Sequence, residues 1–336
     1  MRTAAVIIGI DEYVNRPLTS AVNDARAFRQ ALLDLNLTEE PHITMLTTPL
    51  GDSQAEATRD NIADLLYEFY DHGESYQRLF FFYAGHGLLA FSDPARSRVR
   101  TTLMPSDVQD LQRHGAKLLD LNEIQERFRF SGPEEQFFFV DACRDLDYKA
   151  YPDVGNLGWG GGRPLGAARR QANLYAVSEL GKAEGAAGGL GRMTAHLLDA
   201  LRSDVAAVDY DERQAEWVVS MQSLSDYVKW AVSQELANEP LYKLKYMVPQ
   251  LQEPDPKPSP IRVVDPVGVA WLTIHIEPDE KAAGTQVDIS LRGVRLGDSC
   301  LPPRQNHEQI PLQPQYYRVD ARSGIGSADP ERIVVD

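Results

Sequence analysis

Two residues that can do nucleophilic chemistry together each follow a strongly apolar segment. His86 stands between two glycines directly after RLFFFYA, and Cys143 stands directly after QFFFVDA, 57 residues later. A thiol is nucleophilic as the thiolate, so it needs a nearby base or imidazolium. Because the carboxyl ends of parallel strands gather at one edge of a sheet, we expect His86 and Cys143 to meet there as a dyad.

The glycines beside the histidine would let a substrate backbone approach closely. The N–H groups of Gly87 and Cys143 are therefore candidates for an oxyanion hole around a tetrahedral intermediate. Each residue also has a simpler interpretation, since a lone cysteine after an apolar strand is usually a small buried hydrophobe and a histidine among glycines is often a loop residue. The occurrence of both, each closing a buried strand, favours the dyad.

The segments that must position these residues alternate between strand and helix signals. Continuous apolar segments predict buried strands at residues 4–10, 42–46, 78–85, 135–143 and 173–177. Helical spacing of apolar residues predicts helices at 20–33, 57–70, 121–130, 191–201 and 224–236, with Ser20 capping the first. This alternation predicts an α/β domain with a mostly parallel sheet and helices on both faces.

A change in composition divides the chain. Residues 253–266 are proline-rich and lack a helical period, which predicts a semi-rigid linker. Beyond them, alternating apolar and polar residues predict a small all-β domain of unknown role at 267–336. The α/β domain then occupies residues 1–252.

Composition and charge narrow the function classes. The chain has 336 residues and a formal net charge of −15, which argues against nucleic acid as a partner, since that needs clustered lysine and arginine. No segment approaches the roughly 20 apolar residues that span a bilayer, so we expect no membrane association. Two cysteines are too few for a disulfide scaffold, and the apolar opening lacks signal-peptide features. We expect a cytoplasmic protein.

Several separated motifs resemble those of the caspase-like cysteine peptidases, most closely the metacaspases and their prokaryotic relatives. They are AVIIGIDEY, LTSAVNDARAF, FFFYAGHG, TLMPSDV and FFFVDACRD, in the order and spacing of that family over residues 1–252. The resemblance implies a caspase-hemoglobinase-like three-layer α/β/α fold and a cysteine endopeptidase that requires no cofactor. It implies His86 as general acid and base and Cys143 as nucleophile.

The resemblance also implies a pocket for a basic P1 residue, the residue before the cleaved bond. In metacaspases this pocket is acidic, and Asp24 and Asp141 hold the matching positions here, with Ser178 as a further lining residue. Two carboxylates fit the fork of an arginine guanidinium better than a lysine ammonium, so we expect protein or peptide substrates cleaved after arginine. The alternatives are a first-turn helix carboxylate for Asp24, a carboxylate held by backbone N–H groups for Asp141, and a turn-capping hydroxyl for Ser178.

Members of the family are often cleaved in the loop that follows the nucleophile strand. The glycine-rich loop at 155–170 contains Arg163, Arg169 and Arg170 as candidate self-cleavage sites. Arg163 precedes a proline and is the poorest of the three. An ordinary flexible loop is the alternative interpretation.

Many metacaspases need calcium, and the candidate ligands here are Asp145, Asp147 and Asp153. Their spacing matches no dedicated calcium loop, so a solvated acidic loop is the favoured interpretation.

Three functions stay open. The first is an active arginine-directed endopeptidase, which the resemblance would place as an effector in prokaryotic stress, immunity or cell death. The second is a latent protease that needs an activating protein, acting through the β domain. The third is a catalytically silent scaffold, against which the intact His86 and Cys143 pair counts.

Overall fold

The structure is a computed structural model, and it describes much of the chain. The described residues are 2–91, 99–146, 157, 159, 167–177, 189–204, 206–211, 214, 216–237, 247–254, 256–264, 270–275, 285–291, 294–295, 307–312, 315–323, 326–327 and 331–335. Side chains are described up to Val264, except at residues 145, 146 and 210. The chain forms two compact units, one of residues 1–202 with 220–262 and one of residues 203–219 with 263–336. The domain limits expected from the sequence stay a prediction.

A six-stranded sheet in the order β12-β9-β7-β3-β1-β2 forms the centre of the first unit. Its strands are β1 (Thr3–Ile10), β2 (Ile43–Thr48), β3 (Arg78–Ala84), β7 (Glu135–Asp141), β9 (Arg170–Tyr175) and β12 (Gln250–Gln252). The first five are parallel, and β12 is antiparallel to β9. The mostly parallel sheet predicted from the alternating strand and helix segments is confirmed.

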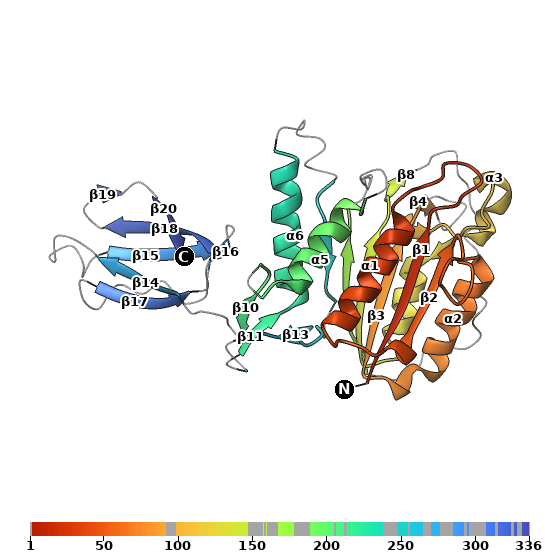
Figure 1. The fold of residues 1–336 in the computed structure, drawn as a ribbon, viewed down its shortest axis with the longest axis horizontal. Coiled ribbons are helices and arrows are strands. Elements are labelled where there is room, and N and C mark those ends of the chain that lie inside the picture. Colours follow the sequence, from red (N-terminus) through yellow and green to blue (C-terminus); the bar gives the residue numbers. More distant parts are fainter. Residues whose placement is uncertain are drawn as a thin grey trace. The chain divides into compact units, whose positions relative to one another are not determined.

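Helices cover both faces of this sheet (Figure 1). The described helices are α1 (Ala21–Asp34), α2 (Arg59–His72), α3 (Leu111–His114), α4 (Leu121–Phe128), α5 (Arg192–Arg202) and α6 (Met221–Glu235), of which the short α3 packs near β4 (Gly87–Phe91) of a second sheet. Two neighbouring phenylalanines of β7 show the layering, because side chains alternate along a strand. Phe139 packs on Phe28 of α1, whereas Phe138 packs on Phe128 of α4. The three-layer α/β/α arrangement follows from this alternation.

The start of α1 differs from the expected cap. Ser20 makes no capping hydrogen bond with its side chain. The carboxylate of Asp11 instead accepts hydrogen bonds from the N–H groups of Ala21 at 2.8 Å and Val22 at 3.3 Å. A carboxylate also suits the positive end of the helix dipole better than a hydroxyl. Asp11 therefore ties the end of β1 to the start of α1.

A small second sheet in the order β6-β5-β4-β8 lies beyond the carboxyl ends of β3 and β7 in sequence. Its strands are β4 (Gly87–Phe91), β5 (Val99–Leu103), β6 (Leu119–Asp120) and β8 (Asp145–Leu146). β4 and β5 form an antiparallel ribbon. The two strands that lead to His86 and Cys143 are thus each continued by a strand of this second sheet.

The described part of the second unit consists of antiparallel strands. They are β10 (Asp209–Asp211), β11 (Glu216–Val219), β14 (Ala270–His275), β15 (Thr285–Leu291), β16 (Val294–Arg295), β17 (His307–Leu312), β18 (Gln315–Ser323), β19 (Gly326–Ser327) and β20 (Glu331–Val335). β13 (Arg262–Val263) contains the last residue of the first unit and the next residue of the second. The strands within 267–336 match the all-β character predicted for that region.

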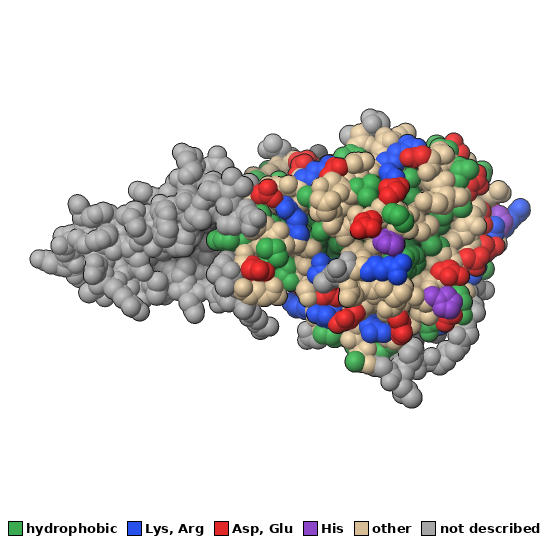
Figure 2. Space-filling view, turned by 60° about the horizontal axis from the view of Figure 1, so that its bottom comes forward, with side chains coloured by type: hydrophobic (Ala, Val, Ile, Leu, Met, Phe, Trp, Pro, Cys, Tyr) green, Lys and Arg blue, Asp and Glu red, His purple; other side chains and the backbone are tan. Residues whose placement is uncertain are grey.

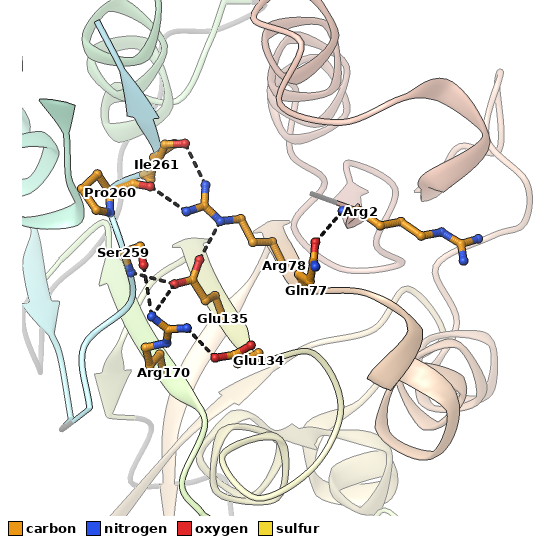
Figure 3. Close-up of polar contacts among 9 residues, drawn as sticks. All are labelled: Arg2, Gln77, Arg78, Glu134, Glu135, Arg170, Ser259, Pro260 and Ile261. Atoms are coloured by element: carbon orange, nitrogen blue, oxygen red, sulfur yellow. Dashed lines mark hydrogen bonds and ion pairs between the residues drawn. The ribbon is translucent and has the colours of Figure 1, made fainter. Parts of the chain in front are cut away.

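Acidic and basic side chains are interspersed on the face of the first unit that Figure 2 shows. A cluster of charged side chains around the buried Glu135 lies at the amino ends of three neighbouring strands (Figure 3). Glu135 of β7 is only 3% exposed, and its carboxylate accepts from Arg78 Nε of β3 at 2.6 Å and lies 3.2 Å from Arg170 Nη1 of β9. We call Arg78, Glu135 and Arg170 the amino-end clamp.

The amino-end clamp holds a later part of the chain. The N–H of Ser259 donates to Glu135 at 2.9 Å. Arg78 donates to the carbonyl oxygens of Ile261 at 3.0 Å and Pro260 at 2.8 Å. Burial alone would raise the pKa of Glu135, but the hydrogen bonds from Ser259 and the Arg78 charge lower it. Three residues of the segment predicted as a linker are therefore anchored to the first unit.

We expect Glu135→Ala to lower the free energy of unfolding by about 3–5 kcal/mol, because it removes the buried carboxylate shared by Arg78, Arg170 and the Ser259 N–H. Urea denaturation measures the change. Glu134→Ala is the matched control, because Glu134 is an exposed partner of Arg170. Its loss should cost at most about 1 kcal/mol. Equal losses in the two variants would show that burial of the carboxylate does not matter.

Candidate active site

Strand pairing places His86 and Cys143 in facing positions. β3 pairs with β7 from Arg78 opposite Glu135 onward, and β4 pairs with β8 at Leu88 opposite Asp145. Partners are 57 residues apart in both ladders, and the same offset relates His86 to Cys143, which lie between the two ladders. The predicted meeting of the two strand ends therefore follows from one continuous register.

The backbone around the histidine is packed closely against the cysteine turn. The N–H of Gly85 donates to the carbonyl oxygen of Asp141 at 3.3 Å. A Cβ atom added at Gly87 would lie 2.8 Å from the carbonyl oxygen of Cys143, so only glycine fits there without a shift. The Cys143 residue itself is half-buried. The turn that carries the His86 imidazole and the turn that carries the Cys143 thiol are thus packed against each other.

A backbone carbonyl orients the imidazole. Nε2 of His86 lies 2.7 Å from the carbonyl oxygen of Arg16, in the loop between β1 and α1. A carbonyl oxygen can only accept, so Nε2 carries the proton and Nδ1 of the neutral ring is left as the basic nitrogen. Burial lowers the pKa of His86, which favours the neutral ring near pH 7. Arg16 has a left-handed backbone with φ of 68°, which is unusual outside glycine.

The residue after the cysteine fixes the turn from the other side. Arg144 is 2% exposed. Its guanidinium donates to Thr101 Oγ1 of β5 at 3.2 Å and to Gln250 Oε1 of β12 at 2.9 Å, and it lies 4.4 Å from the ring centre of Tyr175 of β9. Three strands therefore hold the turn that carries Cys143.

The two predicted pocket carboxylates lie beside each other at the start of α5. The N–H of Gly191 donates to Asp24 at 2.7 Å, and Thr194 donates to Asp141 through its N–H at 3.2 Å and its hydroxyl at 2.7 Å. A Cβ atom added at Gly191 would lie 2.5 Å from Oδ2 of Asp141 and 2.9 Å from Oδ2 of Asp24. Both carboxylates thus pack against the backbone of Gly191, where only a glycine fits without a shift.

Burial makes this acidic pair electrostatically unusual. Asp24 is 2% exposed and Asp141 is 8% exposed. Burial, the neighbouring Asp141 charge and, to a lesser degree, Asp11 raise the pKa of Asp24 to about 8, and burial also raises the pKa of Asp141. Among the described side chains, no lysine or arginine lowers either pKa. Buried carboxylates without a cation are costly, so the pair favours a proton or a cationic ligand.

The predicted self-cleavage residues Arg169 and Arg170 lie at the opposite end of the sheet from Asp141. Arg170 is the first residue of β9 and lies opposite Glu135, the first residue of β7. Glu135 and Asp141 are the first and last residues of β7, six residue steps apart, which corresponds to about 20 Å along the strand. Arg169, whose N–H donates to the carbonyl oxygen of Arg129, lies at the same end.

Some predictions fall outside the described residues. These are the ones on Ser178, Arg163, Asp147 and Asp153, whereas Asp145 is described only by its backbone, as part of β8. Within the described part of the chain, no three His, Cys, Asp or Glu side chains are grouped so as to hold a metal ion. No described helix combines the length and apolarity needed to cross a membrane.

The sequence analysis missed two backbone groups that bind site side chains. The Arg16 carbonyl and the Gly191 amide act through atoms that every residue has, so residue type gave no signal. The hydrogen bonds of Arg144 join segments more than 40 residues apart in the chain, and only the motif position beside Cys143 could have drawn attention to it.

Comparison with known proteins is consistent with this geometry. The caspase domain family model matches residues 2–237. A probable protease from a Desulfuromonadales bacterium is 29% identical over 359 residues, which cover 95% of this chain and 41% of the relative. The chain therefore spans less than half the length of this curated relative. A crystal structure of a Geobacter sulfurreducens protein is similar in fold, with a TM-score of 0.51 and 13% identity over 79% of this chain and 100% of that one.

The raised pKa of Asp24 predicts a pH-dependent cost in stability. A carboxyl group whose pKa is raised on folding costs nothing below its unfolded value near 3.8 and costs most above about 8. We therefore expect Asp24→Asn to raise the melting temperature at pH 9 and to lose this advantage as the pH falls toward 4. Differential scanning calorimetry at several pH values measures it. Asp52→Asn is the control, because the pKa of that exposed carboxyl is lowered by Arg26. A constant difference for Asp24→Asn across pH would contradict the raised pKa.

Proposed function

Because the chain belongs to the caspase domain family, we propose that it is a cysteine endopeptidase that cleaves protein chains after arginine. The observation that carries the proposal is the shared register that sets His86 opposite Cys143, beside a buried pair of carboxylates. Family membership supports peptidase chemistry in general. The dyad and the preference for arginine rest on the geometry of the site.

In the proposed mechanism, Nδ1 of His86 takes the proton of the Cys143 thiol, because Nε2 is committed to the Arg16 carbonyl. The thiolate attacks the carbonyl carbon of the scissile bond, and the N–H groups of Gly87 and Cys143 hold the oxyanion. The imidazolium then protonates the leaving amine, and the peptide bond breaks to leave a thioester. A water molecule, deprotonated by Nδ1, hydrolyses this thioester and restores the thiol.

The proposed specificity follows from the charge of the acidic pair. An arginine guanidinium would supply the cation that Asp24 and Asp141 lack among the described residues, and its planar fork can donate to two carboxylates. Because Gly191 has no side chain, both carboxylates can approach its backbone and lie side by side. A P1 aspartate would add a third negative charge and should be rejected.

A fluorogenic peptide panel with P1 Arg, Lys, Asp or Ala tests the proposal, run with and without calcium. We expect turnover of Arg peptides, and we expect none for Cys143→Ala or His86→Ala. Asp141→Asn should lower kcat/KM for the Arg peptide by about 100-fold, as for a lost buried charge partner. In Asp141→Asn, kcat/KM for the Ala peptide should change little, because a P1 alanine has no positive charge for the carboxylate to bind.

Turnover of Asp peptides would contradict the acidic pocket and keep the dyad. If no peptide is cleaved, a latent protease that needs an activating protein and a silent scaffold are the two functions left. A role as an effector in stress, immunity or cell death is proposed from the family alone.

We also propose that self-processing at Arg169 or Arg170 requires release of the first residues of β9. The Arg170 N–H donates to the Glu134 carbonyl oxygen at 2.9 Å, and the Arg170 guanidinium lies 3.2 Å from the Glu135 carboxylate within the amino-end clamp. A protease needs an extended, accessible segment, which this arrangement denies.

The intact mass of the incubated wild-type protein should therefore stay unchanged, whereas Glu135→Ala should be cut after Arg169 or Arg170. The double variant with Cys143→Ala should stay whole, which separates self-cleavage from a contaminating protease. Rapid cutting of the wild-type protein after Arg170 would contradict this proposal.

A further inference from the structure

Tyr13, in the loop between β1 and α1, contacts both the backbone and the ring of His86. Its hydroxyl accepts a hydrogen bond from the His86 N–H at 2.9 Å. Its ring centre lies 4.5 Å from that of the imidazole, with the two planes tilted by 53°. We propose that Tyr13 is a positioning residue for the His86 imidazole, which rests on the dyad proposed above.

The tyrosine hydroxyl satisfies a group that has no strand partner. His86 lies between β3 and β4, and its N–H is directed to the Tyr13 hydroxyl, which in turn donates to the carbonyl oxygen of Met104 at 3.1 Å. Tyr13 is 5% exposed, so water cannot readily replace it. An unsatisfied buried N–H is costly, and the turn would have to move to find another acceptor.

The turn has little room for such a movement. A Cβ atom added at Gly85 would lie 2.7 Å from the Tyr13 hydroxyl and 2.9 Å from the Tyr83 hydroxyl, so the two tyrosines pack directly against the glycine backbone. The His86 carbonyl oxygen is held by Met104 N at 3.0 Å and by the Tyr83 hydroxyl at 2.8 Å. The backbone of the histidine is therefore fixed at both its polar groups.

The same loop also holds the far side of the imidazole. Arg16, three residues after Tyr13, accepts from Nε2. The loop is itself anchored, because the N–H groups of Asp11 and Glu12 donate to the Thr48 carbonyl oxygen at 2.8 and 3.0 Å. Tyr13 and Arg16 thus confine the ring from its face and from Nε2, which directs Nδ1 away from the loop.

Tyr13→Phe tests the proposal, because it keeps the ring and removes the hydroxyl. We expect kcat for the Arg peptide to fall about 10-fold with KM within about twofold, since the substrate pocket is untouched. Tyr13→Leu, which also removes the ring contact, should lower kcat further.

A second measurement does not depend on any substrate. The rate at which iodoacetamide alkylates Cys143, followed from pH 5 to 10, reports the thiolate that the imidazole stabilises. Tyr13→Phe should slow alkylation near pH 7 and move the midpoint of the profile toward that of an ordinary thiol. His86→Ala gives the reference for complete loss of the imidazole.

Tyr83→Phe is the matched control. Tyr83 is also fully buried, but its hydroxyl reaches the His86 carbonyl oxygen, which keeps its bond from Met104 N. We expect Tyr83→Phe to lower the melting temperature as Tyr13→Phe does while leaving the alkylation midpoint in place.

The outcomes separate the positioning role from the dyad. If Tyr13→Phe lowers the melting temperature but keeps the wild-type kcat and alkylation profile, the residue is structural and the proposal is overturned. If the alkylation midpoint of wild-type Cys143 is about 8.5, as for an ordinary thiol, and His86→Ala does not move it, the proposed dyad is contradicted. The positioning role of Tyr13 is then contradicted with it.

Discussion

The parallel pairing of β3 with β7 is the constraint on which the site depends. Its register continues through the second sheet, so the turns that carry His86 and Cys143 are set opposite each other. The close approach of Gly85 to Asp141 and of Gly87 to Cys143 joins these turns. The aromatic residues Phe80 and Phe137 stack across this pair with ring centres 5.1 Å apart. A slip of one residue would turn each of these buried side chains to the opposite face, so the packing of the core specifies the geometry of the site.

The loop between β1 and α1 links the two halves of the site. Tyr13 and Arg16 hold the imidazole, and the Asp11 carboxylate starts the helix on which Asp24 lies. The acidic pair is in turn held by the first N–H groups of α5. Positions of the reacting groups and of the carboxylates therefore depend on the same short segment, which is anchored to β2 through Thr48.

Side-chain signals in the sequence were enough to predict the mostly parallel sheet with helices on both faces. The roles given to His86, Cys143, Asp24 and Asp141 stay predictions. Buried strands are indicated by continuous apolar segments such as RLFFFYA, and a His or Asp at the end of such a segment can be identified from the residue type. The predicted Ser20 cap was wrong, because the Asp11 carboxylate, nine residues earlier, accepts the hydrogen bonds from the first N–H groups of the helix. Arg170 was assigned to a loop, yet it begins β9, because its polar side chain is satisfied by a glutamate distant in sequence. Such long-range partners, like backbone carbonyls, leave no local pattern.

The seven residues of β7 end in a buried carboxylate on either side, and the two ends differ in charge balance. At the amino end, arginines of the neighbouring strands neutralise Glu135, and its pKa is lowered. At the carboxyl end, Asp141 has Asp24 as its neighbour, and its pKa is raised. Among the described side chains, no arginine or lysine lowers the pKa of Asp24 or Asp141. A cation bound beside them would therefore stabilise the folded state, as Arg78 and Arg170 do at the other end of β7.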